Sequence, residues 1–505
     1  MNVNPSPLFE PVLWDGDGFK ILDETLVPEE IHYIQISEVE QALDAVREMK
    51  TRAFGQVLAF LYSGALLAQR DTHSDAAALR ACIAEMTQQF CDARPTFDFR
   101  GLECFFDEWF VRLPAGAAAG ETIGRQAREF GQQIMHVRQA RARRAAAILP
   151  NPARLLTHCN VSGELVAVAQ CCRELSKEFS VVATETRPYL QGARLTAWEL
   201  AQAGVAVSLI PDAAVAQVVA AGEVNAVIVG ADRVAQNGDI INKVGTYPLA
   251  LMAREYGVPF HALVQDPRSL ERGIDVPIEE RPVAELLRFQ GQSITVVDDP
   301  VLNARYPSFD VTPARLITYL IGFDDLYTPE TFRRKYQSAT TPDPERASEN
   351  GKYILIYGVP PKNQYPFLLS ALKAEQAASI LVPEMRPQLW GAQVVARELL
   401  KRRAPTTLIS DNVMGTLFAQ GEIRKLYLFY ENLAAEGPSG ICGSLLAVQL
   451  ARLHGVAIEL FNGDVCKAST PDSDVSTFLG KEICPAGVAV RPLESEVVPW
   501  SLFKN

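Results

Sequence analysis

The pattern of apolar and polar positions changes at about residue 150. Before that point, apolar residues recur at three- and four-residue spacing, as on one face of an α-helix. This spacing predicts helices over residues 38–50, 55–70, 75–90 and 121–148. Short extended segments on either side of the turn-forming residues 14–18 predict a β-hairpin within residues 9–34. The first 150 residues are therefore expected to form a small hairpin and a helical domain.

After residue 151, short β-rich runs alternate with amphipathic helices. Strands are predicted at residues 155–159, 180–184, 205–210, 226–230 and 258–264. Helices are predicted at residues 192–202 and 213–221, with a third ending near Tyr256. Such alternation is typical of an open parallel sheet with helices on both faces. A stretch rich in Ser, Thr, Pro and charge, residues 333–352, predicts a linker, after which the alternation resumes to the C-terminus.

One long segment of this second region occurs twice. The run ETRPYLQGAR at residues 185–194 recurs as EMRPQLWGAQ at residues 384–393, an offset of 199 from Glu185 to Glu384. The same offset brings together three further pairs, Glu199 with Glu398, Asp212 with Asp411, and Gly222-Glu223 with Gly421-Glu422. We therefore predict that the second region repeats the first sheet domain.

The second copy keeps the scaffold and loses the reactive side chains. Cys159 falls on Gly358, and Asp232 falls on Glu431. Near Asn242-Lys243 the register slips by about one residue, and the second copy has no cation there. Loss of a thiol, an aspartate and a lysine together suggests one working site and one degenerate copy.

These patterns predict an α/β fold. It would have an N-terminal helical domain followed by two Rossmann-like parallel-sheet domains, the second a degenerate repeat. A chain of 505 residues is too long for one core. The expected division is an N-terminal hairpin and helical domain (1–150), a Rossmann-like catalytic domain (151–335), a linker (336–350) and the degenerate repeat (351–505).

Composition narrows the class of partner. The chain is 48% apolar and 21% charged, as in soluble globular proteins, and its net charge is −12. Nucleic acid and anionic membranes both require a broad basic surface, so neither is expected as a partner. A small phosphorylated ligand needs only a local group of cations and stays compatible with this charge. The apolar run at residues 54–67 is short and predicts a core helix, and residues 1–5 show no export signal.

Cysteine and histidine usage argues against disulfide and metal frameworks. The nine cysteines are odd in number and include the adjacent Cys171-Cys172. We therefore expect a reducing, cytoplasmic location. The sequence contains no Cys-x-x-Cys pair and no paired histidines with ligand spacing, so no metal site is expected.

Reactive side chains follow the strands of the first predicted sheet. In open α/β sheets, ligands bind at the carboxyl ends of the strands. The residues expected at this edge are Cys159, Glu185, Arg187, Asp212, Asp232, Asn242 and Lys243. A thiol, carboxylates and cations along one edge indicate a catalytic constellation.

Each of these residues also has a structural interpretation. Cys159 could be an inert core residue, Asp232 a helix cap, and Arg187-Pro188 a turn with a structural ion pair. Asp212 is assigned to helix capping, because the second copy keeps it as Asp411. Cys159 and Asp232 are lost together from the second copy, which favours the catalytic interpretation for this pair.

Around these residues the motifs resemble those of the methylthioribose-1-phosphate isomerase family. The motifs are Thr157-His158-Cys159-Asn160, Glu185-Thr186-Arg187-Pro188, Leu190–Leu200, Gly230-Ala231-Asp232-Arg233, Asn237–Tyr247, Pro277–Arg281 and Phe309–Pro313. The resemblance covers residues 10–325. The same superfamily includes ribose-1,5-bisphosphate isomerase, 5-deoxyribose-1-phosphate isomerase and non-catalytic regulatory subunits of a translation-initiation exchange factor.

The resemblance implies a role for each matching residue. Cys159 matches the catalytic cysteine and Asp232 the general acid. The residues that match a sugar-phosphate site are Gln191, Asn242, Lys243, Arg52 with its neighbour Ala53, and Arg94 of the later Arg-Pro pair. Arg52 precedes the helix that begins near Gly55, and Arg94-Pro95 is expected to start another helix. Helix N-termini attract anions, although both arginines could instead be solvated surface residues.

The implied reaction converts an aldose 1-phosphate to a ketose 1-phosphate. It would need no cofactor, and no Gly-x-Gly-x-x-Gly signature of a dinucleotide site follows the first strand. Asp232 would need a pKa raised by burial, and Cys159 a pKa lowered by a helix terminus or a cation. The alternative is a non-catalytic protein that senses a sugar phosphate or a nucleotide.

Three departures from the family bear on the substrate. Ala53-Phe54-Gly55 is expected to put a ring near the phosphate, and residues 161–164 and 265–269 differ near the expected position of the fifth carbon. Arg268 favours a substituent other than methylthio. We expect the second copy, residues 351–505, to occupy the place of a partner subunit, so that the chain is an intrachain pseudo-dimer. The alternatives are a homodimer and an appended domain that serves another partner.

Overall fold

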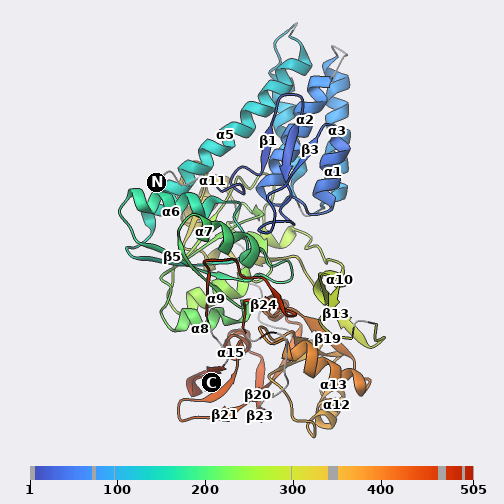
Figure 1. Ribbon diagram of the computed structural model, residues 1–505, viewed down its shortest axis with the longest axis vertical. Helices are drawn as coiled ribbons and strands as arrows, with labels where there is room; N and C mark the ends of the chain where they lie inside the picture. The colour runs from blue at the N-terminus through green and yellow to red at the C-terminus, as the bar shows by residue number, and fades with distance from the viewer. Residues whose placement is uncertain are drawn as a thin grey trace.

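The computed structural model describes residues 6–70, 75–95, 97–115, 117–296, 298–338, 351–464, 472, 474–491 and 495–503. Most of the predicted linker, residues 339–350, lies outside the described residues. The helices of the N-terminal region stand at the top of Figure 1, the first large sheet lies in the middle, and the second lies at the bottom. The fold is a mixed α/β fold with a large, mostly parallel sheet, as predicted.

The N-terminal region is a small antiparallel sheet joined to five helices. The predicted hairpin is present and gains a third strand, with the order β1 (Val12–Trp14), β2 (Phe19–Leu22) and β3 (Tyr33–Ile36). The helices are α1 (Val39–Arg47), α2 (Phe54–Arg70), α3 (Ala76–Ala93), α4 (Phe99–Val111) and α5 (Ala119–Ile148). Their apolar faces meet in a core of their own, in which the rings of Phe60, Phe90, Phe99 and Phe106 pack together.

Arg94 does not start a helix, contrary to the prediction. It is the C-terminal cap of α3, and α4 begins five residues later at Phe99. The cap of α4 is Asp98, whose carboxylate accepts the backbone N–H of Gly101. The Arg-Pro pair therefore lies in the connection between two helices, because an acidic side chain nearer to the apolar run provides the stronger start signal.

The first large sheet has the order β16-β15-β10-β7-β4-β5-β6-β26. All neighbours are parallel except β15 and β16. The strands are β4 (Ala153–Thr157), β5 (Phe179–Thr184), β6 (Ala206–Ile210), β7 (Ala226–Gly230), β10 (Phe260–Leu263), β15 (Tyr319–Ile321), β16 (Leu326–Tyr327) and β26 (Ala489–Val490). The five strands predicted from β-rich runs are all present.

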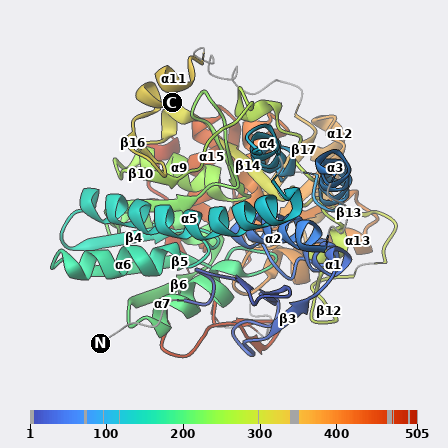
Figure 2. The same cartoon turned by 90° about the horizontal axis from the view of Figure 1, so that it is seen from above.

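Helices cover both faces of this sheet. Figure 2 shows α5 lying along α6 above the sheet, which couples the helical region to the strands. The helices of this region are α6 (Glu164–Glu174), α7 (Trp198–Gln202), α8 (Val215–Ala220), α9 (Thr246–Glu255), α10 (Val283–Leu287) and α11 (Pro329–Tyr336). The predicted helix at 192–202 begins as a π-helical segment, Gly192–Ala197, before α7. Gly192 is required there, because a Cβ would lie 1.8 Å from the carbonyl oxygen of Thr184.

A small antiparallel sheet, β14-β9-β8, lies beside the large one. Its strands are β8 (Arg233–Val234), β9 (Ile240–Lys243) and β14 (Phe309–Thr312). Two short hairpins lie outside the large sheets, β11-β12 (Arg288–Phe289, Gln292–Ser293) and β24-β25 (Thr477–Phe478, Lys481–Glu482).

The region after residue 351 contributes five strands to a six-stranded parallel sheet with the order β13-β19-β18-β17-β20-β23. Its strands are β13 (Leu302–Ala304), β17 (Tyr353–Tyr357), β18 (Ser379–Pro383), β19 (Thr406–Ile409), β20 (Ile423–Tyr430) and β23 (Ala457–Asn462). Its helices are α12 (Tyr365–Ala374), α13 (Ala396–Lys401), α14 (Met414–Ala419) and α15 (Ser444–Leu453). A second small sheet, β21-β22-β27, is formed by Asn432–Leu433, Pro438–Ile441 and Ser495–Val497. A π-helical segment, Gly391–Val395, stands in the place that Gly192–Ala197 occupies in the first sheet.

The two large sheets exchange edge strands. Strand β13 comes from residues before the linker, yet Leu302 to Ala304 pair with Thr406 to Leu408 of β19 in the second sheet. Strand β26 comes from residues near the C-terminus, yet Ala489 and Val490 pair with Ser208 and Leu209 of β6 in the first sheet. Each sheet is therefore completed by the other half of the chain.

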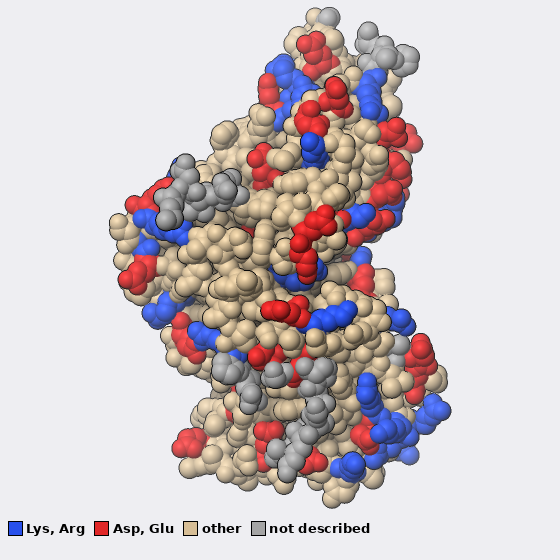
Figure 3. Space-filling model, in the orientation of Figure 1, with Lys and Arg blue, Asp and Glu red and all other residues tan. Residues whose placement is uncertain are grey.

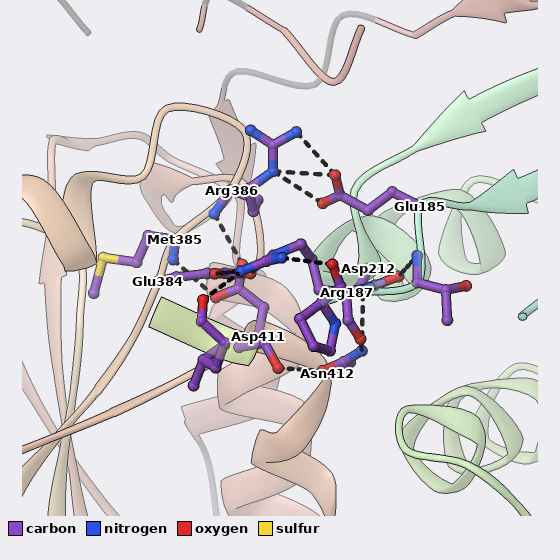
Figure 4. Close-up of polar contacts among 12 residues, drawn as sticks. Glu185, Arg187, Asp212, Glu384, Met385, Arg386, Asp411 and Asn412 are labelled. Atoms are coloured by element: carbon purple, nitrogen blue, oxygen red, sulfur yellow. Dashed lines mark hydrogen bonds and ion pairs between the residues drawn. The ribbon is translucent and has the colours of Figure 1, made fainter. Parts of the chain in front are cut away.

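Two reciprocal ion pairs join the sheets. Arg187 donates from Nε and Nη2 to the Glu384 carboxylate at 2.8 and 2.9 Å, and Arg386 donates to the Glu185 carboxylate at 2.8 to 3.1 Å (Figure 4). All four side chains are at most 1% exposed. Each half thus presents the same Glu-x-Arg segment to the other, as in a two-fold symmetric interface.

Glu185, Arg187 and Asp212 lie at the predicted sheet edge but contact the second half of the chain. The first two belong to the interface, and their ion pairs are structural, which was the alternative for Arg187-Pro188. Asp212 caps no helix; its carboxylate accepts the backbone N–H groups of Thr186 and Arg187 at 2.8 and 2.7 Å. Asp411 accepts the equivalent pair from Met385 and Arg386 (Figure 4). Asp212 and Asp411 thus shape the Glu-x-Arg loop of their own half in the same way.

None of the helices among the described residues is long and apolar enough to cross a membrane. On the face that Figure 3 shows, acidic and basic side chains are interspersed over most of the surface.

Replacing Arg386 with Met should destabilise the protein by about 3–5 kcal/mol, because Glu185 is left buried without a cation. Arg386 lowers the pKa of Glu185, which burial raises to about 7, so the loss should be greater at alkaline than at acidic pH. Urea unfolding followed by circular dichroism measures this. Arg402→Met breaks the partly exposed pair with Glu398 and should cost less than about 1 kcal/mol. Equal losses in the two variants would contradict the structural role of the interface pair.

Candidate active site

A cavity of about 50 Å³ lies where the carboxyl ends of β4 and β7 face the helical region. Its walls include Cys159, Asp232, Arg52, Ala53, Arg94, Gln191 and Lys243. Seven of the eight residues singled out in the sequence therefore meet in one place, although up to 191 positions separate them, from Arg52 to Lys243. The eighth, Asn242, lines an adjoining larger cavity, and its amide donates to Thr246 Oγ1 at 2.9 Å.

The backbone at Cys159 is held in an unusual conformation. Its φ angle is 66°, in the left-handed region that non-glycine residues rarely adopt. Two hydrogen bonds fix it there: the N–H donates to Thr186 Oγ1 at 2.9 Å, and the carbonyl accepts from Thr196 Oγ1 at 2.7 Å. Strained residues of this kind persist where the surroundings determine them, and they are frequent at functional sites.

Burial sets the protonation of the two reactive groups. It raises the pKa of the Cys159 thiol to about 11, although the Lys243 ammonium acts to lower it. It also raises the pKa of Asp232 above its ordinary value, against the opposing effects of Lys243 and Arg94. Both groups therefore favour their neutral, proton-carrying forms more strongly than the free side chains do.

Lys243 is a buried cation without an ion pair among the described residues. Its Nζ lies 4.9 Å from the ring centroid of Phe309, 5.7 Å from that of Tyr189 and 5.9 Å from that of Tyr306. Lys243 is 3% exposed, and burial lowers the pKa of its ammonium group. Aromatic faces compensate only part of the lost hydration, so an anion brought next to Lys243 would be strongly attracted.

The two arginines are also incompletely satisfied. Arg52 lies 3.9 Å from Glu24 and Arg94 lies 3.6 Å from Glu279, distances too long for hydrogen bonds. The Nε atoms of Arg52 and Arg94 and Oε1 of Gln191 are buried and have no hydrogen-bond partner among the described residues. Buried polar groups are nearly always paired in native proteins. The two guanidinium groups are therefore suited to anionic oxygens of a ligand, and Gln191 Oε1 to a hydroxyl group.

Some residues of the site carried no sequence signal. Glu24 follows β2, lines the cavity, and accepts the N–H of Arg52 at 3.1 Å; burial raises its pKa to about 7. Asp310, part of a motif noted in the sequence, accepts the N–H groups of Gly245 and Tyr247 and so fixes the loop after Lys243. An isolated glutamate in an irregular segment has no periodicity or motif by which it could be identified.

The adjoining cavity is much larger, about 490 Å³, and shares Ala53, Phe97, Asn160, Ser162 and Asp232 with the small one. One side is apolar and comes from the helical region, including Phe54, Phe105, Phe130 and Ile134. The polar part of the lining includes Gln265, Asp266, Arg268 and Lys335.

The residues that depart from the family pattern line this larger cavity. Phe54 belongs to it alone, so its ring does not lie in the wall that holds the arginines; it stacks instead under the Arg138 guanidinium, 3.9 Å away. Arg268 lies over the ring of Phe105 at 4.1 Å. Glu164 is held by ion pairs with Arg138 and Arg141.

The chemistry available in the small cavity is acid–base chemistry beside an anion site. It combines a thiol, the carboxyl groups of Asp232 and Glu24, and three cations. Among the described residues, no cluster of three or more His, Cys, Asp or Glu side chains is arranged to hold a metal ion.

Known proteins resemble the chain over its first two thirds. It is 37% identical over 329 residues to methylthioribose-1-phosphate isomerase of Desulforudis audaxviator, an alignment that covers 62% of this chain and 92% of that protein. It is 34% identical over 329 residues to 5-deoxyribose 1-phosphate isomerase of Moorella thermoacetica, with the same coverage of both chains. The resemblance predicted from the motifs is thereby confirmed.

Solved structures of two related proteins resemble this fold. The fold is similar to 5-methylthioribose 1-phosphate isomerase of Pyrococcus horikoshii, with a TM-score of 0.56 and 29% identity over 67% of this chain and 98% of that one. It is similar to the delta subunit of translation initiation factor eIF-2B of A. fulgidus, with a TM-score of 0.55 and 29% identity over 65% and 99%. Residues 56–322 match the model of the Initiation factor 2 subunit family, more than half of the chain. The chain belongs to the Initiation factor 2 subunit family.

Proposed function

We propose that the protein is an isomerase that converts a 5-substituted ribose 1-phosphate to the ribulose 1-phosphate. Methylthioribose 1-phosphate or a close analogue is the expected substrate. The observation that carries this proposal is the meeting of Cys159 and Asp232 in one cavity with Arg52, Arg94 and Lys243. The names of the relatives, methylthioribose-1-phosphate isomerase and 5-deoxyribose 1-phosphate isomerase, support the same substrate class.

The phosphate group of such a substrate would occupy the wall with the three cations. Arg52 and Arg94 supply unpaired N–H donors and Lys243 a charge without an ion pair among the described residues, while the unpaired Oε1 of Gln191 is an acceptor that suits a hydroxyl group of the sugar. Guanidinium groups bind phosphate oxygens with fixed geometry, which would orient the first carbon of the sugar. Asn242 and Ala53 would border the sugar ring between the two cavities.

The phosphate on the anomeric oxygen prevents spontaneous ring opening, so an acid must protonate the ring oxygen. Asp232 suits this role because burial raises its pKa and favours the protonated form. As the bond between the first carbon and the ring oxygen breaks, Asp232 becomes a carboxylate. Hydrogen then moves from the second carbon to the first, and the hydroxyl on the second carbon loses its proton to become the ketone.

Cys159 would carry a proton in this second stage. A thiolate, expected from the sequence, is not the resting form, because burial raises the pKa of the thiol to about 11. The Lys243 ammonium lowers that pKa, so it stabilises the thiolate when it forms beside the substrate. The arrangement serves both a hydride shift and an enediol route, since each requires an acid at the ring oxygen and a base near the second carbon.

A large substituent on the fifth carbon can be accommodated. Asp232 lines both cavities, and the fifth carbon is attached next to the ring oxygen that Asp232 would protonate. The substituent would therefore extend into the cavity of about 490 Å³, which Phe54 and Arg268 line. The alternative function, a non-catalytic sensor of sugar phosphates or nucleotides, is supported by the similarity to the eIF-2B delta subunit.

We further propose that residues 351–505 are a degenerate copy of the sheet domain, residues 151–335, that takes the place of a partner subunit. The helical region, residues 1–150, and the linker, residues 336–350, complete this division. Support comes from the reciprocal ion pairs, the exchanged strands β13 and β26, and the rings of Phe289 and Phe478, which pack edge to face from equivalent hairpins. At the position of Gln191 the second copy has the half-buried Trp390, and at that of Lys243 it has Ile441.

The test of the function is turnover of methylthioribose, deoxyribose and ribose 1-phosphates, followed by NMR for ketose formation. We expect activity with at least one, loss of detectable turnover in Cys159→Ser, and a reduction of kcat by about 10²–10⁴-fold in Asp232→Asn. Both variants should still bind the sugar phosphate, because the cations of the phosphate wall are intact. Unchanged turnover in Cys159→Ser would refute the catalytic assignment, and binding without turnover of any sugar by the natural protein would favour the sensor.

The Cys159 thiol should react slowly with iodoacetamide near neutral pH and faster as the pH rises towards about 11. Lys243→Met removes the cation that lowers the thiol pKa, so alkylation at a given alkaline pH should be slower in the variant. Peptide mass spectrometry measures the rate, and the exposed Cys82 and Cys104 serve as internal controls. Rapid alkylation of Cys159 at neutral pH would contradict the protonated resting form.

Ending the chain at Tyr336, the last residue of α11, should lower solubility. The truncation removes β26 from the first sheet and uncovers apolar residues of the core that the two halves share, such as Ala213 and Tyr247, which are buried in the full chain. Dye binding to apolar surface and size-exclusion chromatography report the result. A soluble, monomeric and fully active fragment would rule out the partner role of residues 351–505.

A further inference from the structure

The second half of the chain reaches the loop that supports Cys159. Asn412 lies in a short 3-10 turn, Asp411–Val413, and is 2% exposed. Its side-chain amide donates to Asp212 Oδ2 at 2.9 Å and to the carbonyl oxygen of Arg187 at 3.0 Å (Figure 4). Ser410 donates to Asn412 Oδ1 at 2.7 Å, which fixes the orientation of the amide.

Asp212 connects this contact to the cysteine. Its carboxylate accepts the N–H of Thr186 at 2.8 Å, and Thr186 Oγ1 in turn accepts the N–H of Cys159 at 2.9 Å. The path from Asn412 to the cysteine backbone therefore consists of three hydrogen bonds between buried groups. In a low-dielectric interior such connected hydrogen bonds strengthen one another.

The end of this path is a residue that needs support. Cys159 has a left-handed backbone, and its N–H bond to Thr186 is one of the two contacts that hold it. Asn412 also packs closely against Gly245, where an added Cβ would lie 2.9 Å from the Asn412 Cβ. Gly245 follows Lys243 by two residues, so the same side chain borders both loops of the cavity.

The described part of the first half provides no equivalent polar contact to the second half. At the offset of 199, the counterpart of Asn412 is Ala213, which faces Gly443 across the interface. Among the described residues, no side chain of the first half donates to Asp411, which accepts only the N–H groups of Met385 and Arg386. The cysteine position of that half is Gly358. The polar support is therefore present on the side of the interface that has the thiol.

We infer that Asn412 is a positioning residue for Cys159, supplied to the site of the first half by the second half of the chain. Asn412 acts through Asp212 and Thr186 and touches no substrate. Its kinetic consequence rests on the proposed isomerase function, while its effect on the thiol does not.

The test compares Asn412→Leu with Gln449→Leu in the full-length chain. Gln449 is a matched control: it is also a buried amide of the second half, and it donates across the interface at 2.8 Å, but to Tyr256 at the end of α9. Misplacement of a reactive group by about 1 Å costs on the order of 10²-fold in rate, so Asn412→Leu should lower kcat by tenfold or more. KM should change little, because the phosphate wall makes no contact with Asn412.

A second readout requires no turnover. Alkylation of Cys159 by iodoacetamide should be several-fold faster in Asn412→Leu, because the loop that holds the cysteine opens more readily. It should be unchanged in Gln449→Leu. Asn412→Ser, a smaller change, replaces Asn412→Leu if that variant does not fold.

Two results would overturn the inference. One is a kcat and an alkylation rate for both Asn412 variants within twofold of the natural protein. The other is an equal effect of Gln449→Leu, which would show a general loosening of the interface. If the natural protein turns over no sugar phosphate, the proposed function fails, and the alkylation rates alone decide the role of Asn412.

Discussion

The reciprocal ion pairs between Glu185 and Arg386 and between Arg187 and Glu384 are the constraint on which the arrangement depends. Removing four charges from water is costly, and only close, multidentate hydrogen bonds offset that cost. The hydrogen-bond distances of these ion pairs therefore restrict the positions of the Glu-x-Arg loops in both halves of the chain. Because Thr186 lies between Glu185 and Arg187 and also accepts from Cys159, the same restriction extends into the cavity.

The cavity itself is governed by an excess of positive charge in a buried space. Three cations line it, and the carboxylates nearest to them lie at distances that leave the guanidinium groups incompletely satisfied. Burial disfavours every charged form. It therefore raises the pKa of Asp232 and of Cys159 and lowers the pKa of Lys243. An anionic ligand would relieve the excess of charge while leaving the two proton carriers in place.

The sequence predicted what depends on local periodicity. Apolar runs such as residues 226–230 gave the strands of the first sheet, and the duplicated Glu-x-Arg-Pro segment pointed to a second sheet. The order of the strands at the two outer edges could not be predicted, because β13 and β26 are three and two residues long and pair with strands of the other half. Nothing in their composition identifies a partner so distant in the chain.

The site was predicted through its motifs and missed where motifs were lacking. Cys159, Asp232 and Lys243 stand at the carboxyl ends of strands, where topology brings ligands, so their convergence followed from the fold. Arg94 reached the same cavity from the end of α3, although the sequence placed it at the start of a helix. Glu185, Arg187 and Asp212 share that sheet edge with the thiol, and only the three-dimensional structure separates the residues that face the cavity from those that face the second half. The recurrence of these residues as Glu384, Arg386 and Asp411 was the available signal, since an interface between the halves requires the same residues on both sides.

The exchange of edge strands also bears on how such a chain can diverge. When two halves of a symmetric assembly are separate molecules, a copy that has lost its thiol can pair with another such copy and yield a dead particle. Here the halves are covalently joined and each completes the other's sheet, so on the division that we propose every molecule contains one of each kind. Substitutions can then accumulate on one side of the axis without diluting the population of complete sites.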